Sequence, residues 1–190
     1  MSTLLETTVQ KFLNPTKVYS HTEIFAANSP IPKEGGVYGL HFRNMPEFVP
    51  VGDCTKFDDL YMLHVGISPE KPKKGKGPSS ENMYKRIRNH YTKTAEGSTL
   101  RFSLGCVLQK ALDIRLRLIG KSRTFGDGEK KLSLWMSENV FVSWLVDSEP
   151  WLVVEGVIER TSLPLNIQNN SSNSFVTILK DMRSRARESC

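Results

Sequence analysis

The chain has 190 residues, of which 38% are hydrophobic and 24% charged, and its formal net charge is +6. This length suffices for one domain to bury a core without disulfide or metal support, and the composition is that of an ordinary soluble globular protein. No run of residues approaches the length of a membrane-spanning helix.

The chain ends and the cysteines bear on the cellular compartment. The first ten residues lack the apolar stretch of a signal peptide. Cys54, Cys106 and Cys190 are scattered, without the spacing of a metal site, which favours free thiols in a reducing compartment. We expect a cytoplasmic protein, or a nuclear one if the source is eukaryotic.

The first part of the chain predicts two strands behind an N-terminal extension. Residues 1–34 open with a short amphipathic stretch and end in a turn-rich run, and we expect them to pack on a domain formed by residues 35–190. Residues 36–42 alternate with β-branched and aromatic side chains, and residues 60–67 are apolar enough for the interior of a sheet. Residues 48–59 read as a connecting loop.

The second part predicts mostly helices. Residues 68–80 form a polar loop, Ser80 is a candidate N-cap for a helix from about residue 81 to 93, and Thr99 can begin a helix that runs to about residue 118. A polar loop over 120–129, a helical turn over 133–139 and a strong strand over 140–146 follow. Pro150 opens a helix that ends near Ser162, and a basic helix closes the chain from residue 175 to about 187.

This order, β-β-α-α-β-α-α, predicts an α+β fold (an α/β sandwich) with a small three-stranded sheet flanked by helices. Because the first two strands are close in sequence, we expect them to pair antiparallel.

Positive charge is concentrated between residues 70 and 93, where eight basic residues face two acids, Glu70 and Glu81. Such a field attracts polyanions, although a solvated basic loop would have the same composition. On the nucleic-acid interpretation, the substrate-binding residues are Lys73, Lys74, Lys76 and Arg88.

Three side chains, Tyr38, Arg86 and His90, could take part in phosphate chemistry. Arg86 and His90 are four residues apart on one predicted helix and therefore share a face, where they could bind a phosphate and hold a proton. Tyr38 lies between two glycines on the first strand, where a ligand can approach closely. Each also has a plainer interpretation, a basic helix face with a satisfied histidine and a packed tyrosine.

Glu155 is a lone carboxylate in an apolar helical segment. It must reach solvent, pair with a base or bind a cation, because an unpaired buried carboxylate is costly. One carboxylate completed by waters and a substrate phosphate is a normal arrangement for Mg²⁺, and a salt bridge explains the residue equally well.

Taken in order, these motifs resemble the GIY-YIG nuclease superfamily over residues 35–170. Gly36-Val37-Tyr38 and His64-Val65-Gly66 stand for its two named motifs. Arg86 and His90 match its helix residues, Glu155 its metal-binding glutamate and Asn166 its downstream asparagine. The second motif departs from the family pattern, because His64 stands where tyrosine is usual.

The resemblance implies an endonuclease that hydrolyses DNA phosphodiester bonds with one divalent cation, Mg²⁺ or Mn²⁺, held by Glu155. Tyr38 would be the general base, assisted by His90, and His64 could serve as a base or orienting group. Arg86 would stabilise transition-state charge, and Asn166 would position a phosphate or fix its own loop.

The alternatives are a non-catalytic or weakly catalytic nucleic-acid-binding relative of the same fold and an enzyme of another class built on the same sheet. Homodimerisation would suit the cleavage of two strands, but no residue pattern indicates it.

Overall fold

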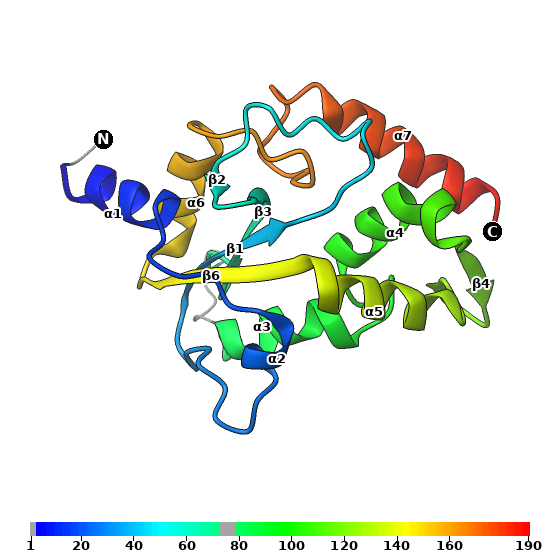
Figure 1. The fold of residues 1–190 in the computed structure, drawn as a ribbon, viewed down its shortest axis with the longest axis horizontal. Coiled ribbons are helices and arrows are strands. Elements are labelled where there is room, and N and C mark those ends of the chain that lie inside the picture. The colour runs from blue at the N-terminus through cyan, green and yellow to red at the C-terminus, as the bar shows by residue number, and fades with distance from the viewer. Residues whose placement is uncertain (1–2, 73–78) are drawn as a thin grey trace.

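The computed structural model describes residues 3–72 and 79–190. Its elements, in chain order, are α1 (Thr3–Leu13), α2 (His21–Ile24), β1 (Gly36–Phe42), β2 (Lys56–Phe57), β3 (Leu60–Ser68), α3 (Met83–Thr92), α4 (Thr99–Leu112), β4 (Arg117–Ile119), β5 (Ser122–Thr124), α5 (Gly128–Asn139), β6 (Val140–Val146), α6 (Pro150–Ile158) and α7 (Phe175–Glu188). Figure 1 shows a central sheet with helices around it, which confirms the predicted α+β class.

The main sheet has the strand order β2-β3-β1-β6, and all its pairs are antiparallel. The predicted antiparallel pairing of the first two strands is therefore confirmed. Every residue of β1 is buried, as expected for an inner strand that is covered on both faces.

The predicted number of strands, three, is wrong by one. The fourth strand, β2, has only two residues, Lys56 and Phe57, which pair with Tyr61 and Leu60 across a tight turn. A segment of two residues shows no alternation, so the loop-like sequence around it concealed the pairing. A separate two-stranded hairpin, β4–β5, likewise occupies a segment expected to hold a helix end and a loop.

Helix ends also differ from expectation, for local reasons. The side chain of Asn82, not Ser80, caps α3 by accepting a hydrogen bond from the Lys85 N–H at 3.0 Å. Helix α4 stops at Leu112, because Asp113 adopts a left-handed conformation with φ of 48°. Helix α5 is longer than the predicted turn.

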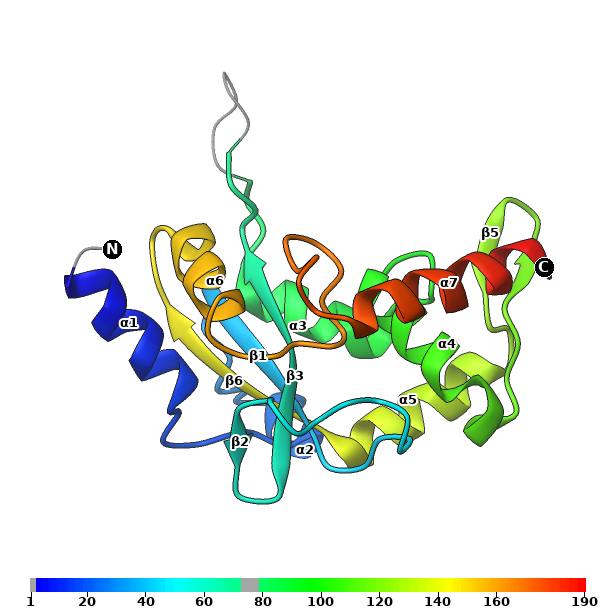
Figure 2. The ribbon, with the colours of Figure 1, turned by 90° about the horizontal axis from the view of Figure 1, so that it is seen from above.

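The two faces of the sheet are covered by different helices. Val37 of β1 and Met62 and Val65 of β3 share one apolar cluster with residues of α1 and α6. Tyr38, Leu40 and Leu63 belong to the other cluster, to which α3, α4 and α5 contribute. Figure 2 shows the sheet between these groups of helices, and the pocket described below is lined by residues of both groups.

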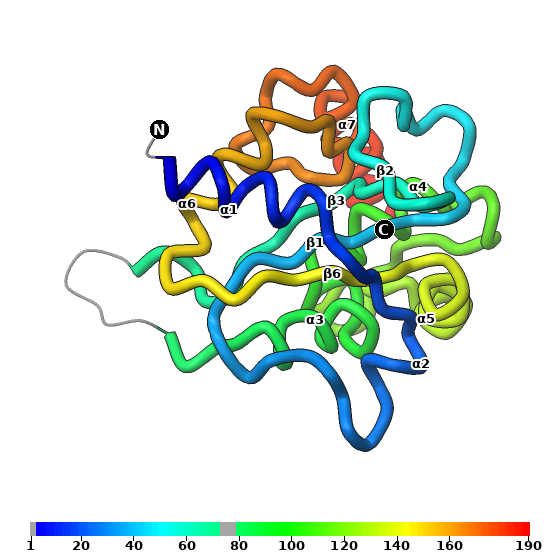
Figure 3. The backbone as a smooth tube through the Cα atoms, turned by 60° about the vertical axis from the view of Figure 1, so that its left-hand side comes forward, coloured from blue at the N-terminus to red at the C-terminus, as the bar shows by residue number. Residues whose placement is uncertain are grey.

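The N-terminal segment is integrated with this sheet. Figure 3 shows α1 alongside α6, and Val9 and Phe12 are buried against it. Tyr19 exchanges two backbone hydrogen bonds with Val142 of β6, at 2.8 and 2.9 Å. These contacts support the proposal that residues 1–34 are an extension packed on a domain of residues 35–190. None of the helices within the described ranges combines the length and apolar character needed to cross a membrane.

A buried histidine on the α1/α6 face predicts a specific loss of stability in acid. His41 is fully buried, its Nε2 lies 2.8 Å from Ser143 Oγ, and burial lowers its pKa to about 4. In the unfolded chain this histidine binds its proton near pH 6.5, whereas in the folded protein it does so only near pH 4. The contribution of the neutral His41 to the free energy of unfolding should therefore be fully present above about pH 6.5 and decrease progressively toward pH 4. Urea denaturation at pH 8, 6 and 5 measures the slope.

The variant His41→Gln removes one of the buried imidazoles and should flatten that slope. An unchanged pH dependence in the variant would show that other groups govern the acid sensitivity.

Candidate active site

The site begins with a close approach between β1 and β3. Tyr38 stands directly opposite Gly66 in the sheet register, and its ring lies over that glycine. A Cβ atom at position 66 would come within 2.3 Å of the tyrosine Cζ and hydroxyl oxygen. The glycine of the second motif is therefore required by the tyrosine of the first.

A chain of side-chain contacts runs inward from this tyrosine. The Tyr38 hydroxyl lies 2.7 Å from Nε2 of His90, and the other ring nitrogen of His90 lies 2.9 Å from the Ser98 hydroxyl. Ser98 is the N-cap of α4, where its oxygen also accepts a hydrogen bond from the Arg101 N–H. Strand β1 and helices α3 and α4 thus meet in one buried Tyr–His–Ser chain.

Burial sets the protonation of these groups. It raises the pKa of Tyr38 to about 12, against the opposing effect of the nearby Arg86 guanidinium. It also holds the pKa of His90 well below the usual value, and the charges of His64 and Arg86 act in the same direction. The ground state at neutral pH is therefore a neutral phenol beside a neutral imidazole.

His64 approaches this chain from β3, just after an irregularity in the strand. The register shifts between Leu40 and His41 of β1, which leaves Leu63 as an extra residue of β3 beside His64. The His64 and His90 rings are nearly perpendicular, with centroids 6.1 Å apart. Burial lowers the pKa of His64 to about 4, and its Nδ1 has no hydrogen-bond partner among the described residues.

Asn166 holds the open edge of β3 beside the site. Its side-chain oxygen accepts a hydrogen bond from the Val65 N–H, and its amide nitrogen donates one to the Val65 carbonyl, both at 2.8 Å. The neighbouring Leu165 N–H donates to the carbonyl of Leu63. The amide oxygen and one amide N–H are engaged in this way, so Asn166 positions the strand that carries His64, and it also lines the pocket described next.

One pocket of about 380 Å³ gathers the side chains that the sequence motifs singled out. Its lining includes Tyr38, His64, Arg86, His90, Glu155 and Asn166. The carboxylate of Glu155 is exposed there, and it makes no ion pair or hydrogen bond within residues 3–72 and 79–190. Arg86 is half-buried, and its Nε has no hydrogen-bond partner in the same ranges. The pocket therefore offers both a carboxylate and a guanidinium to a ligand.

The residues expected to bind substrate are placed differently. Arg88 lies outside the pocket, where it donates to the Ile24 carbonyl at 3.1 Å and its guanidinium covers the rings of Phe25 and Tyr84. It is thus engaged in joining α3 to the N-terminal segment. Lys73, Lys74 and Lys76 lie outside the described residues.

Some residues at the site were not anticipated. Ser98 could have been identified as a helix cap, but its contact with His90 depends on how α3 and α4 pack. Glu70 adds a second carboxylate to the pocket lining, and Arg183 reaches it from the C-terminal helix α7. Within the described part of the chain, no three His, Cys, Asp or Glu residues cluster as metal ligands, so a bound cation would depend mainly on Glu155 and on water or substrate oxygens.

Comparison with known proteins identifies the family. The model of the GIY-YIG catalytic domain matches residues 36–185, which is most of the chain. No curated protein and no solved structure matches significantly.

The contact between Gly66 and Tyr38 predicts the effect of one added methyl group. Gly66→Ala should displace the tyrosine ring and lower the free energy of unfolding by about 1–3 kcal/mol, because the site has no room for the new carbon. Chemical denaturation measures this loss. Gly52→Ala is the matched control, since a Cβ there meets nothing within 4 Å, and equal stability losses in the two variants would contradict the packing argument.

Proposed function

Because this chain belongs to the GIY-YIG nuclease superfamily, we propose that it is a divalent-metal-dependent endonuclease that hydrolyses DNA phosphodiester bonds. The observation that carries the proposal is the single pocket lined by Tyr38, Arg86, His90 and Glu155. These side chains come from β1, α3 and α6. A base, a cationic phosphate ligand and a carboxylate therefore face one space.

Tyr38 is the proposed general base. In its phenolate form it takes a proton from the attacking water while the new P–O bond forms and the bond to the leaving oxygen breaks. The neutral His90, 2.7 Å away, can accept the phenol proton or donate a hydrogen bond to the phenolate. The nearby guanidinium of Arg86 favours the phenolate further.

Arg86 and His64 are proposed to bind the reacting phosphate. The half-buried guanidinium of Arg86 has an unpartnered Nε and can stabilise negative charge that grows on the phosphate oxygens. His64 lines the same pocket with an unpartnered Nδ1. Burial lowers its pKa to about 4, so the imidazole is neutral at neutral pH. It can orient water or a phosphate oxygen from the position at which the family usually has a tyrosine.

The exposed carboxylate of Glu155 fits the family's dependence on a divalent cation. Glu155 would hold the ion, Mg²⁺ or Mn²⁺, with Glu70 in the same pocket lining. When bound, the cation supplies positive charge to the phosphate and its leaving oxygen.

The proposal is tested with purified protein and plasmid DNA. Cleavage should require Mg²⁺ or Mn²⁺ and stop with EDTA. Arg86→Ala and Glu155→Gln should each reduce the rate by about 10²-fold or more, because each removes charge stabilisation of the transition state. Lys85→Ala on α3 and Glu159→Gln, the residue that directly follows α6, are the matched controls; both residues are exposed and lie outside the pocket lining.

Each outcome of this assay has a defined meaning. Equal activity in the Arg86, Glu155 and control variants would contradict the site assignment. Salt-dependent DNA binding by the wild type without any cleavage would instead favour a non-catalytic relative of the same fold.

The raised pKa of Tyr38 predicts the pH profile of the reaction. With a pKa of about 12, the phenolate fraction rises about tenfold per pH unit throughout the neutral and weakly alkaline range. The histidines of the site remain neutral there, so log(kcat/KM) should rise with a slope near 1 from about pH 7 to 9. Steady-state rates in buffers of constant ionic strength measure it.

Tyr38→Phe keeps the ring over Gly66 and removes only the hydroxyl. It should lower kcat by about 10²–10⁴-fold and abolish the rise with pH. A rise of the same slope in this variant would exclude Tyr38 as the base.

A further inference from the structure

A second pocket adjoins the candidate active site and has no role in the chemistry described above. It has a volume of about 260 Å³, and its lining includes Arg123 of β5 and Arg183 and Arg187 of α7. Thr99 and Arg183 line both pockets. Whatever occupies the first pocket can therefore continue into the second.

Two arginines of this pocket share one aromatic ring. The guanidinium carbons of Arg183 and Arg187 lie 4.7 and 4.9 Å from the ring centroid of Phe102 on α4. Arg183 also donates a hydrogen bond to the Ser103 hydroxyl at 3.1 Å. In residues 3–72 and 79–190, neither guanidinium has a carboxylate partner, whereas Arg185 on the same helix pairs with Asp181 at 2.8 Å.

Packing alone explains this arrangement poorly. Arginine stems can cover an aromatic ring and join two helices, but one cation on the ring suffices for that contact. Two like charges beside each other repel, and burial together with the charge of Arg187 lowers the pKa of Arg183. An anion between them would remove this cost.

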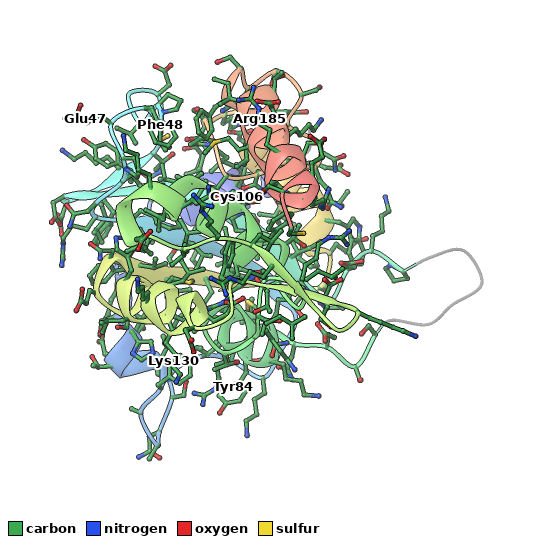
Figure 4. The ribbon with its side chains drawn as sticks, turned by 90° about the vertical axis from the view of Figure 1, so that its right-hand side faces the viewer. Glu47, Phe48, Tyr84, Cys106, Lys130 and Arg185 are labelled. Atoms are coloured by element: carbon green, nitrogen blue, oxygen red, sulfur yellow. The ribbon has the colours of Figure 1, made fainter. Side chains whose placement is uncertain are left out.

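We propose that this pocket, lined by Arg123, Arg183 and Arg187, binds a backbone phosphate of the DNA strand next to the phosphate that is cleaved. The inference rests on the proposed function, because it needs a DNA strand in the adjoining pocket. Figure 2 shows the β4–β5 hairpin near the C-terminal end of α7, so the strand would pass between these two elements. Figure 4 shows Arg185 on α7, a solvent-facing side chain outside the pocket lining.

One carboxylate in the pocket lining counteracts the positive charge of the arginines. Glu96 lines the pocket, and its Oε2 accepts a hydrogen bond from the Arg123 backbone N–H at 2.9 Å. It forms no ion pair with an arginine side chain among the described residues, and it should repel a phosphate. Removing the negative charge of Glu96 is therefore expected to strengthen DNA binding, whereas a loss of folded structure would weaken it.

The test measures binding to a fluorescein-labelled DNA duplex by anisotropy, with Ca²⁺ in place of Mg²⁺ and between 50 and 300 mM NaCl. The double change Arg183→Gln and Arg187→Gln should weaken binding roughly tenfold and reduce the slope of log K against log salt by about 1 to 2. Glu96→Gln should tighten binding several-fold and keep the hydrogen bond to Arg123. Arg185→Gln makes the same substitution outside the pocket, with the same charge change as Arg187→Gln alone, and should alter binding little.

Thermal unfolding separates these effects from loss of structure. If the double variant unfolds, the single change Arg187→Gln, at an exposed residue, is measured in its place and should lower the salt slope by about 1. The proposal is overturned if the pocket variants bind like Arg185→Gln, or if Glu96→Gln leaves binding unchanged.

The same samples distinguish this proposal from the proposed function. A wild type that cleaves DNA, with pocket variants of unaltered binding, would remove the phosphate site alone. A wild type that neither binds nor cleaves DNA would remove both.

Discussion

The buried guanidinium of Arg101 is the interaction on which the arrangement of the site helices depends. It is 1% exposed and pairs with Glu129 of α5 at 2.8 Å. It also donates to the carbonyls of His90, Tyr91 and Glu129 and to the Ser133 hydroxyl. A buried charge is tolerated only when its donors are satisfied in this way. One side chain of α4 thereby fixes the end of α3 and the start of α5.

Glu129 extends this constraint into the preceding loop. Burial acts to raise the pKa of its carboxyl, but hydrogen bonds from the Ala95 and Phe125 backbones and from Arg101 together lower it. The carboxylate therefore stays ionised opposite the guanidinium. The segment between α3 and α4 and the turn before α5 are both held by the buried ion pair of Arg101 and Glu129. A neutral substitution at one of these two residues would leave the charge of the other without its partner.

The positions of Tyr38 and His90 follow from these contacts. Arg101 holds the carbonyl of His90, while Ser98, three residues before Arg101, lies against the imidazole of the same residue. On the other side, the Tyr38 ring packs against Gly66, in the space that a side chain at that position would fill. The phenol and the imidazole therefore meet at 2.7 Å, as the proposed proton transfer requires.

Charged side chains of both signs line the two adjoining pockets. Arg86 lines the first pocket together with Tyr38 and His90, and Arg183 lines both pockets. Glu155 brings a carboxylate from α6 into the same space, as a site for a cation requires. Basic side chains therefore extend from Arg86 to α7, and each pocket also has a carboxylate in its lining, Glu70 and Glu155 in the first and Glu96 in the second.

The sequence by itself determined the features that depend on local pattern. Strands β1, β3 and β6 follow from their apolar and β-branched runs, and Pro150 marks the start of α6. The antiparallel pairing of β1 and β3 follows from the short connection between them. The motif order also predicted the family, which the match over residues 36–185 confirms. These features need only neighbours in the chain, and so the residues alone specify them.

Tertiary structure decided the features in which distant groups meet. The two-residue strand β2 exists only through its partner β3, and the amide of Asn166 turned out to bind the backbone of Val65 across about a hundred residues of chain. Arg88 belongs by sequence to the basic segment, yet its side chain packs on Phe25. The two arginines on Phe102 could not be foreseen either, because periodicity places side chains on a helix face but does not reveal what that face meets.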